Sequence, residues 1–366
     1  MMKKCIVTGI LSAVMTIIMC IGAGMTAFAV EGGETDSTAT ITKNLEMDPN
    51  VTTPDATFTF HFEKVSLDDV TTEDAKNSMP EINDQTTSFA STDNGTNTDG
   101  VKTVTKNTSN VVPSGESFPH AGVYRYHVTE KNNGYTNDDT TSMIWSLAEY
   151  NMDVYVANKA DGSLYVKNVV VYSTKDNMGE ALDTKVDKML FTNKFMKTSS
   201  LSVKKIISGD YADMSKKFNF KLILNNSKMA NDTSYSGTIT RNDGTTETVN
   251  FTAGTEASFM LGNGETLELA NLPVGTRYSV GEENEGYKVS IETIVNGQKV
   301  TGEANGAIQN DILVGEGENS TTYTNTKETT VPTGIIVNNL PFFLMVLVAV
   351  SGFAAYIAVR RQRMNK

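Results

Sequence analysis

Four short segments with a strand-like pattern occur twice in this chain of 366 residues, in the same order. Within them, apolar side chains stand at alternate positions, which is the spacing of a β-strand with one buried face. Because both the patterns and their order repeat, we predict an all-β protein with two copies of one domain, joined near residues 196–200. The paired segments are ATITKNL and LSVKKII, ATFTFHF and KKFNFKL, GVYRYHVTEKNNGY and GTRYSVGEENEGY, and LFTNKF and TYTNTK.

The two expected domains span residues 30–197 and 198–327. The first is longer because it contains a polar insertion at about 68–115, rich in Thr, Asn, Asp and Ser. Such a composition favours a long solvated loop over core. We predict no long amphipathic helix outside the two ends of the chain.

The N-terminal end has the layout of a secretory signal peptide. Residues 1–29 combine Lys3 and Lys4 with an apolar stretch and a final Ala-Phe-Ala sequence. This arrangement predicts export, with cleavage after Ala29. Both cysteines lie inside the predicted signal, so the mature chain would have no disulfide to stabilise it.

The C-terminal end predicts a membrane anchor. Residues 340–359 carry no charge, a length that crosses a bilayer as a helix. The basic tail at residues 360–366 would stay on the cytoplasmic side.

Charge and histidine content exclude several kinds of function. The chain has 31 Lys and Arg against 43 Asp and Glu, a formal net charge of −12, which disfavours a nucleic-acid partner. His61, His120 and His127 are scattered without metal-ligand partners at useful spacing. We therefore expect neither a metal nor a cofactor.

In three of the repeated segments, a polar residue lies on the strand face that is expected to point into the core. Side chains two residues apart in a strand share a face, so a lysine, a glutamate and an asparagine stand in line with apolar residues in both copies. The same rule selects Lys205 over its neighbour Lys204. The residues concerned are Lys43, Glu130 and Asn193 in the first copy, and Lys205, Glu282 and Asn325 in the second.

Burial gives such a triad a reaction. It lowers the pKa of a lysine and raises the pKa of a glutamate, so the amine can be neutral and nucleophilic. A protonated glutamate can then donate to the asparagine side-chain oxygen, and attack by the amine releases ammonia and leaves a Lys–Asn amide. The hypothesis is a Lys43–Asn193 bond promoted by Glu130 and a Lys205–Asn325 bond promoted by Glu282. The simpler alternative is one buried ion pair per domain, or a strand-end residue that reaches solvent.

These residues carry a resemblance to a known family. The segments TITKNL, GVYRYHVTE and FTN in the first copy, with LSVKK, NLPVGTRYSVGE and YTN in the second, resemble the major (backbone) pilins of Gram-positive sortase-assembled pili. The likeness is to the two-domain streptococcal type with internal Lys–Asn isopeptide bonds. It implies tandem immunoglobulin-like sandwiches of the collagen-adhesin B type, serving as a structural shaft subunit rather than an enzyme. One departure is Gly281, where the family pattern has Thr before the glutamate.

The sequence Val331-Pro332-Thr333-Gly334, ahead of the predicted span, is similar to a sortase sorting signal. The resemblance implies cleavage between Thr333 and Gly334 and transfer of the Thr333 carbonyl to an amine. The usual wall-anchoring signal has one more residue between Pro and Thr, so the shorter form implies a dedicated pilus sortase.

Polymerisation would need an acceptor lysine, and the resemblance points to the residues just ahead of Asn193. Lys185 and Lys188 both fit this position, and the sequence does not decide which of them is the acceptor. The implied partners are a sortase, other copies of the chain, minor pilins and cell-wall peptidoglycan, with the membrane only a precursor's anchor. The expected location is the cell wall and cell surface. The alternative function is a monomeric wall-anchored adhesin; for a surface enzyme the sequence offers no site.

Overall fold

The computed structural model describes residues 34–283, 285–300, 308–328, 345–346, 349–350 and 353. Strands dominate this part of the chain, which confirms the all-β prediction. The regular helical elements among its numbered elements are α1 (Glu73–Ser78) and the 3-10 turn η1 (Gly115–Ser117). The predicted signal peptide and sorting sequence lie outside the described residues, as does most of the predicted span.

A first unit is a sandwich of two sheets. One sheet has the order β4-β5-β1-β11, with β7 also paired to β11, and the other has the order β10-β9-β8-β6-β2-β3. The strands are β1 (Ile41–Met47), β2 (Ala56–Leu67), β3 (Gln85–Phe89), β4 (Thr96–Thr98), β5 (Val101–Asn107), β6 (Gly122–Lys131), β7 (Thr141–Ile144), β8 (Glu149–Asn158), β9 (Leu164–Lys175), β10 (Ala181–Val186) and β11 (Met189–Ser208).

A second unit repeats this architecture. One sheet has the order β14-β13-β16-β11 and continues beyond β11 with β21, β18 and β19, while the facing sheet has the order β15-β12-β17-β20. The strands are β12 (Phe218–Asn225), β13 (Ser234–Thr240), β14 (Thr246–Thr252), β15 (Ala257–Leu261), β16 (Thr266–Pro273), β17 (Arg277–Glu282), β18 (Lys288–Val295), β19 (Gln298–Val300), β20 (Ile308–Leu313) and β21 (Ser320–Thr326).

Each unit has its own hydrophobic core between its two sheets. In the first, apolar side chains of β1 and β11 meet the aromatic side chains of β2 and β6. In the second, β11 and β21 meet β12 and β17. The alternating burial along these strands is the pattern that the sequence predicted, because each strand turns one face to the core and one to solvent.

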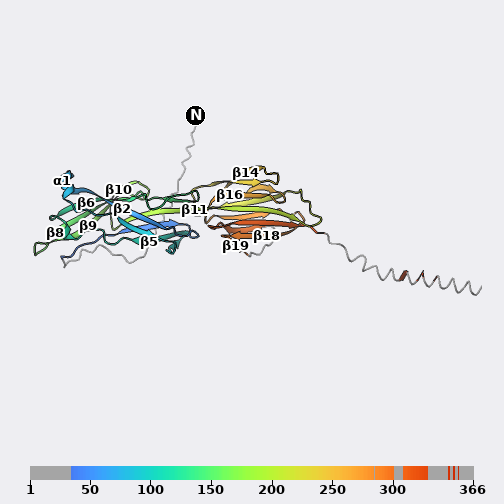
Figure 1. Cartoon of the computed structure of the whole chain (residues 1–366), viewed down its shortest axis with the longest axis horizontal. Coiled ribbons are helices and arrows are strands. Elements are labelled where there is room, and N and C mark those ends of the chain that lie inside the picture. Colours follow the sequence, from blue (N-terminus) through green and yellow to red (C-terminus); the bar gives the residue numbers. More distant parts are fainter. Residues whose placement is uncertain are drawn as a thin grey trace, which may run out of the picture.

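The two units share the strand β11, which is 20 residues long. Its first half pairs with β1 in the first unit and its second half pairs with β16 and β21 in the second. Figure 1 shows it running from one unit into the other along the long axis of the molecule. The predicted junction at residues 196–200 therefore lies inside an unbroken strand.

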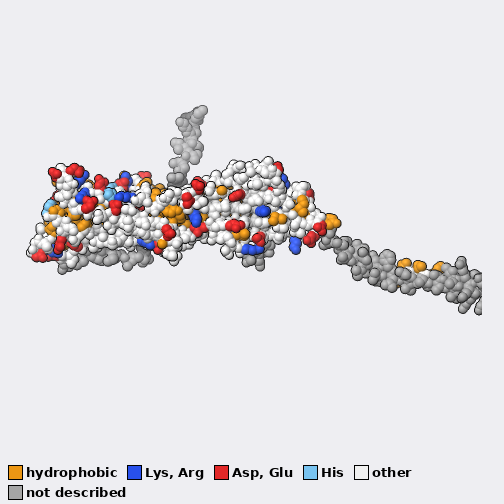
Figure 2. Space-filling model, viewed as in Figure 1, with side chains coloured by type: hydrophobic (Ala, Val, Ile, Leu, Met, Phe, Trp, Pro, Cys, Tyr) orange, Lys and Arg blue, Asp and Glu red, His pale blue; other side chains and the backbone are white. Residues whose placement is uncertain are grey.

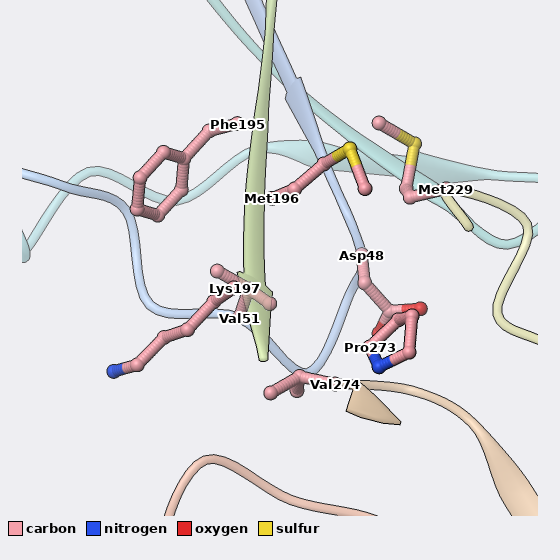
Figure 3. A pocket seen from close by; sticks show the side chains of 8 residues that line it. All are labelled: Asp48, Val51, Phe195, Met196, Lys197, Met229, Pro273 and Val274. Atoms are coloured by element: carbon pink, nitrogen blue, oxygen red, sulfur yellow. The ribbon is translucent and has the colours of Figure 1, made fainter. Parts of the chain in front are cut away.

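Side chains of both units line a small pocket beside this strand. Asp48 and Phe195 contribute from the first unit, and Met229 and Pro273 from the second (Figure 3). Asp48 also accepts a hydrogen bond from Ser227 Oγ of the second unit at 2.6 Å. The units thus make direct contact beside β11.

The prediction of a solvated loop at about 68–115 is wrong. This segment forms α1 and the strands β3, β4 and β5, and residues 102–107 of β5 pair with β1. Met79, Ile82 and Val104 from it are buried in the first core. Its polar composition hid these strands because Thr, the residue that fills them, is both polar and a good strand former.

The surface carries charges of both signs. Figure 2 shows acidic and basic side chains interspersed over the visible face of both units. In the described part of the chain, no helix is both long enough and apolar enough to cross a membrane.

Candidate functional site

A lysine, a glutamate and an asparagine meet in the core of the first unit. Lys43 and Asn193 lie on β1 and β11, neighbouring parallel strands of one sheet, and Glu130 reaches them from β6 in the facing sheet. Lys43 Nζ lies 2.7 Å from Glu130 Oε2, and Asn193 Nδ2 donates to Glu130 Oε1 at 2.7 Å. All three side chains are shielded from solvent. One carboxylate therefore contacts both the attacking and the leaving nitrogen of the expected reaction.

The second unit contains the same cluster. Lys205 on β11 and Asn325 on β21 lie on neighbouring parallel strands, and Glu282 reaches them from β17. Lys205 Nζ lies 2.8 Å from Glu282 Oε2, and Asn325 Nδ2 donates to Glu282 Oε1. Lys204 is exposed, as the alternation rule predicts. The predicted residues therefore come together in both units.

The strand register is also the same in the two clusters. Each lysine lies opposite an aromatic residue two positions before the asparagine, Phe191 in the first unit and Tyr323 in the second. Each glutamate lies opposite the second aromatic residue of the strand that follows the lysine strand in the chain. These residues are Phe60 on β2 and Phe220 on β12. The internal repeat thus reproduces the positions of the reacting groups as well as the fold.

One aromatic ring covers each lysine amine, a role that was not predicted from the sequence. Lys43 Nζ lies 4.5 Å from the centre of the Phe58 ring, and Lys205 Nζ lies 4.2 Å from that of Phe218. Both phenylalanines are fully buried, so they exclude water from the amine. The signal was present, because the aromatic strand is one of the four repeated segments.

Burial shifts the pKa values of both pairs toward their neutral forms. It lowers the pKa of Lys43 and of Lys205 to about 8, although the neighbouring carboxylate opposes the shift. Burial also raises the pKa of Glu130 and of Glu282, against the opposing effect of the lysine. A proton passed from lysine to glutamate therefore costs much less here than in water, and the neutral amine is accessible.

The orientation of the Asn193 amide differs from the expectation. We expected Glu130 to donate to the amide oxygen, but Glu130 contacts Nδ2, and Oδ1 accepts from the backbone N–H of Ser146 at 2.7 Å. A backbone N–H can only donate, so Oδ1 has to face it. In the second unit, Asn325 Oδ1 is buried and has no hydrogen-bond partner among the described residues.

Both candidate acceptor lysines are exposed. Lys185 lies on β10, the edge strand of its sheet, and Lys188 lies in the turn between β10 and β11. Exposure therefore does not identify which of the two is the acceptor. The described residues contain no group of His, Cys, Asp or Glu that could hold a metal ion.

Comparison with known proteins gives matches over nearly the whole chain. Residues 39–196 match the Spy0128-like isopeptide containing domain, and residues 199–330 match a domain of unknown function, DUF7601. The chain is 29% identical over 352 residues to a pilin of Streptococcus pyogenes serotype M1, a match that covers 92% of this chain and 96% of that protein.

Similar solved structures are also pilins. The crystal structure of the major pilin from Streptococcus pyogenes has a TM-score of 0.37 and 23% identity, and covers 81% of this chain and 100% of that one. The major pilin T3.2 from another Streptococcus pyogenes serotype has a TM-score of 0.34 and 27% identity, with the same two coverages.

The first unit thus contains, within residues 39–196, the buried cluster of Lys43, Glu130 and Asn193, and the sequence match extends through both units. Residues 39–196 match the Spy0128-like isopeptide containing domain, and the similarity of nearly the whole chain to a streptococcal pilin supports a structural subunit of a pilus.

Proposed function

We propose that this chain is the shaft subunit of a covalent cell-surface pilus and that each of its units is closed by a Lys–Asn amide bond. One observation carries the proposal: a wholly buried Lys–Glu–Asn cluster recurs in both units at the same strand register. Buried charged pairs often stabilise no more than apolar residues of similar size, so a second identical pair calls for a role beyond packing.

The reaction balances without a cofactor. The neutral lysine Nζ attacks the asparagine Cγ, the Nζ–Cγ bond forms, and the Cγ–Nδ2 bond breaks to release ammonia. The glutamate contacts both nitrogens, so it can take the proton from the attacking nitrogen and pass it to the leaving one. The fixed geometry of the core supplies the effective concentration. The reaction occurs once per unit and turns over no external substrate.

The position of the acceptor lysine decides which bond would carry tension. If the next subunit is attached at Lys185 or Lys188, a pulling force enters just before β11 and leaves after β21. The Lys205–Asn325 bond lies on that path and bypasses the rest of the second unit. The Lys43–Asn193 bond lies beside the path, so it would stabilise the first unit without bearing the load.

The internal bonds are tested by the intact mass of the segment from Val30 to Thr333, measured after denaturation. The expected mass is lower than the calculated mass by two ammonia molecules. Glu130→Ala and Glu282→Ala should each restore one ammonia. Glu149→Ala is the matched control, because this glutamate on β8 is 28% exposed and should leave the deficit at two. A parent mass equal to the calculated value would remove the crosslinking hypothesis.

Polymerisation is tested on cell-wall extracts of a host that expresses the pilus sortase. A covalent ladder is expected for the natural chain and its loss for Thr333→Ala. Loss of the ladder in Lys185→Ala or in Lys188→Ala alone would identify the acceptor. A single wall-linked band for the natural chain would instead support the monomeric adhesin, the alternative function.

A further inference from the structure

The amide of Asn193 is held by two separate partners. Its Nδ2 donates to Glu130, and its Oδ1 accepts from the Ser146 N–H, in the segment between β7 and β8. Ser146 is itself buried, with 4% of its surface exposed. The carbonyl oxygen and the leaving nitrogen of the expected reaction are therefore recognised by different groups.

The backbone that carries this N–H is fixed to β11. Ser146 Oγ donates to Asn177 Oδ1 at 2.6 Å, and the same oxygen accepts from the Thr192 N–H at 2.8 Å. The Leu147 N–H donates to the Asn177 backbone oxygen at 3.1 Å. Asn177 thus ties the Ser146 segment to the residue just before Asn193, so the donor and the amide keep their relative positions.

A donor at this point suits the transition state. When an amine attacks an amide carbon, negative charge develops on the carbonyl oxygen. A preorganised backbone N–H directed at that oxygen stabilises the charge more than it stabilises the ground state. The chemistry and the geometry are those of an oxyanion hole with one donor.

The second unit has no such donor among the described residues. Asn325 Oδ1 is buried and unpartnered, although Nδ2 is bound to Glu282 as in the first unit. The two clusters are otherwise alike in strand register, lysine–glutamate distance and aromatic cover. The oxygen of the reacting amide is thus the point where they differ.

We propose that the Ser146 N–H is an oxyanion donor that accelerates formation of the Lys43–Asn193 bond, so that the first unit crosslinks before the second. This inference rests on the proposed function. Removing one oxyanion donor typically slows a reaction about 10²–10³-fold, and the same factor separates the expected rates of the two units.

The first experiment compares the units in chains that can form only one bond. Asn325→Ala leaves only the first bond, and Asn193→Ala leaves only the second. Chains recovered unlinked from inclusion bodies would be folded at about pH 5, where both lysines are charged, and shifted to about pH 8. Ammonia loss is then followed by mass. The expected result is a first-unit rate about 10²–10³-fold above the second-unit rate.

Equal rates, or a faster second unit, would overturn the proposal but leave the proposed function intact. Absence of ammonia loss from both chains would instead remove the internal-bond part of the proposed function, and this proposal with it. The comparison needs no change at Ser146, so it does not depend on whether a variant at that position folds.

The second experiment removes the donor itself. In the Asn325→Ala chain, Ser146→Pro deletes the N–H, and Ser146→Ala is the matched control that keeps it. The expected result is crosslinking slowed about 100-fold by Pro and by much less with Ala. Trp145, the one tryptophan of the chain, has its ring centre 5.8 Å from that of Phe58. Its fluorescence therefore reports whether the segment between β7 and β8 packs in its native position. Native fluorescence with an unchanged rate in the Pro variant would refute the role of Ser146.

Discussion

Asn325→Ala should destabilise the second unit by far more than its lost contacts explain. The bond that Asn325 would form with Lys205 closes a loop of about 120 residues, and chain-entropy arguments developed for disulfides give about 5 kcal/mol for such a loop. Removing the buried amide also deprives Glu282 of one hydrogen bond, which costs about 1–3 kcal/mol. The two contributions must be separated before the first can be measured.

A double-mutant cycle separates them. In a Lys205→Met chain no bond can form, so Asn325→Ala costs only the truncation, and the difference between the two backgrounds is the contribution of the bond. Met leaves Glu282 without its partner, but that cost is common to both members of the cycle. We expect a coupling free energy of about 5 kcal/mol.

Calorimetry is the suitable assay because each unit has its own core. The second-unit transition should fall by on the order of 15 °C in Asn325→Ala, while the first-unit transition stays in place. Asn193→Ala is the reciprocal control and should lower the first transition instead. A coupling below about 1 kcal/mol, in a parent chain whose mass shows both ammonia losses, would refute the loop-closure reasoning.

Three further predictions concern stability. In the Asn325→Ala chain Lys205 stays a free amine, whose pKa is about 8 in the folded state against 10.5 in the unfolded state. Between these two pH values the unfolded state binds more protons, so the unfolding free energy should rise from about pH 8 to 10.5, by up to about 3 kcal/mol. Denaturation at several pH values measures this rise. Gly275→Ala should loosen the contact between units, because Gly275 has φ +93° and a Cβ there would lie 1.9 Å from Asp48 Oδ2. We expect faster proteolysis between the units, and unchanged proteolysis would contradict this. Asn319→Ala should cost at least about 3 kcal/mol in urea denaturation, because this buried amide bonds backbone groups of two loops and of strand β11. A loss under about 1 kcal/mol would argue against that role.

Much of the candidate site followed from strand alternation alone. The rule that residues two apart share a face assigned Lys43 and Lys205 to the interior and Lys204 to the surface, as the structure has them. The repeat then grouped each lysine with one glutamate and one asparagine. These assignments succeed because the direction of a side chain in a strand is a local property of the backbone.

Other features needed the folded chain. The strands at about 68–115 were missed because Thr-rich strands and polar loops have similar compositions. The continuity of β11 through residues 196–200 was also not visible, since nothing in a polar Thr-Ser sequence says whether a strand continues or ends. The cover of Phe58 and Phe218 could have been inferred from the repeat, but only with the register in hand.

The sequence by itself determined which side chains of the repeated strands enter the two cores, because apolar residues occupy every second position along each of them. Only the tertiary structure decided which atoms meet there. Asn193 Oδ1 accepts a hydrogen bond from the Ser146 N–H, and every residue except proline carries such a group. A backbone donor has no sequence signature of its own, so the difference between the two clusters arises from how the chain between β7 and β8 is placed.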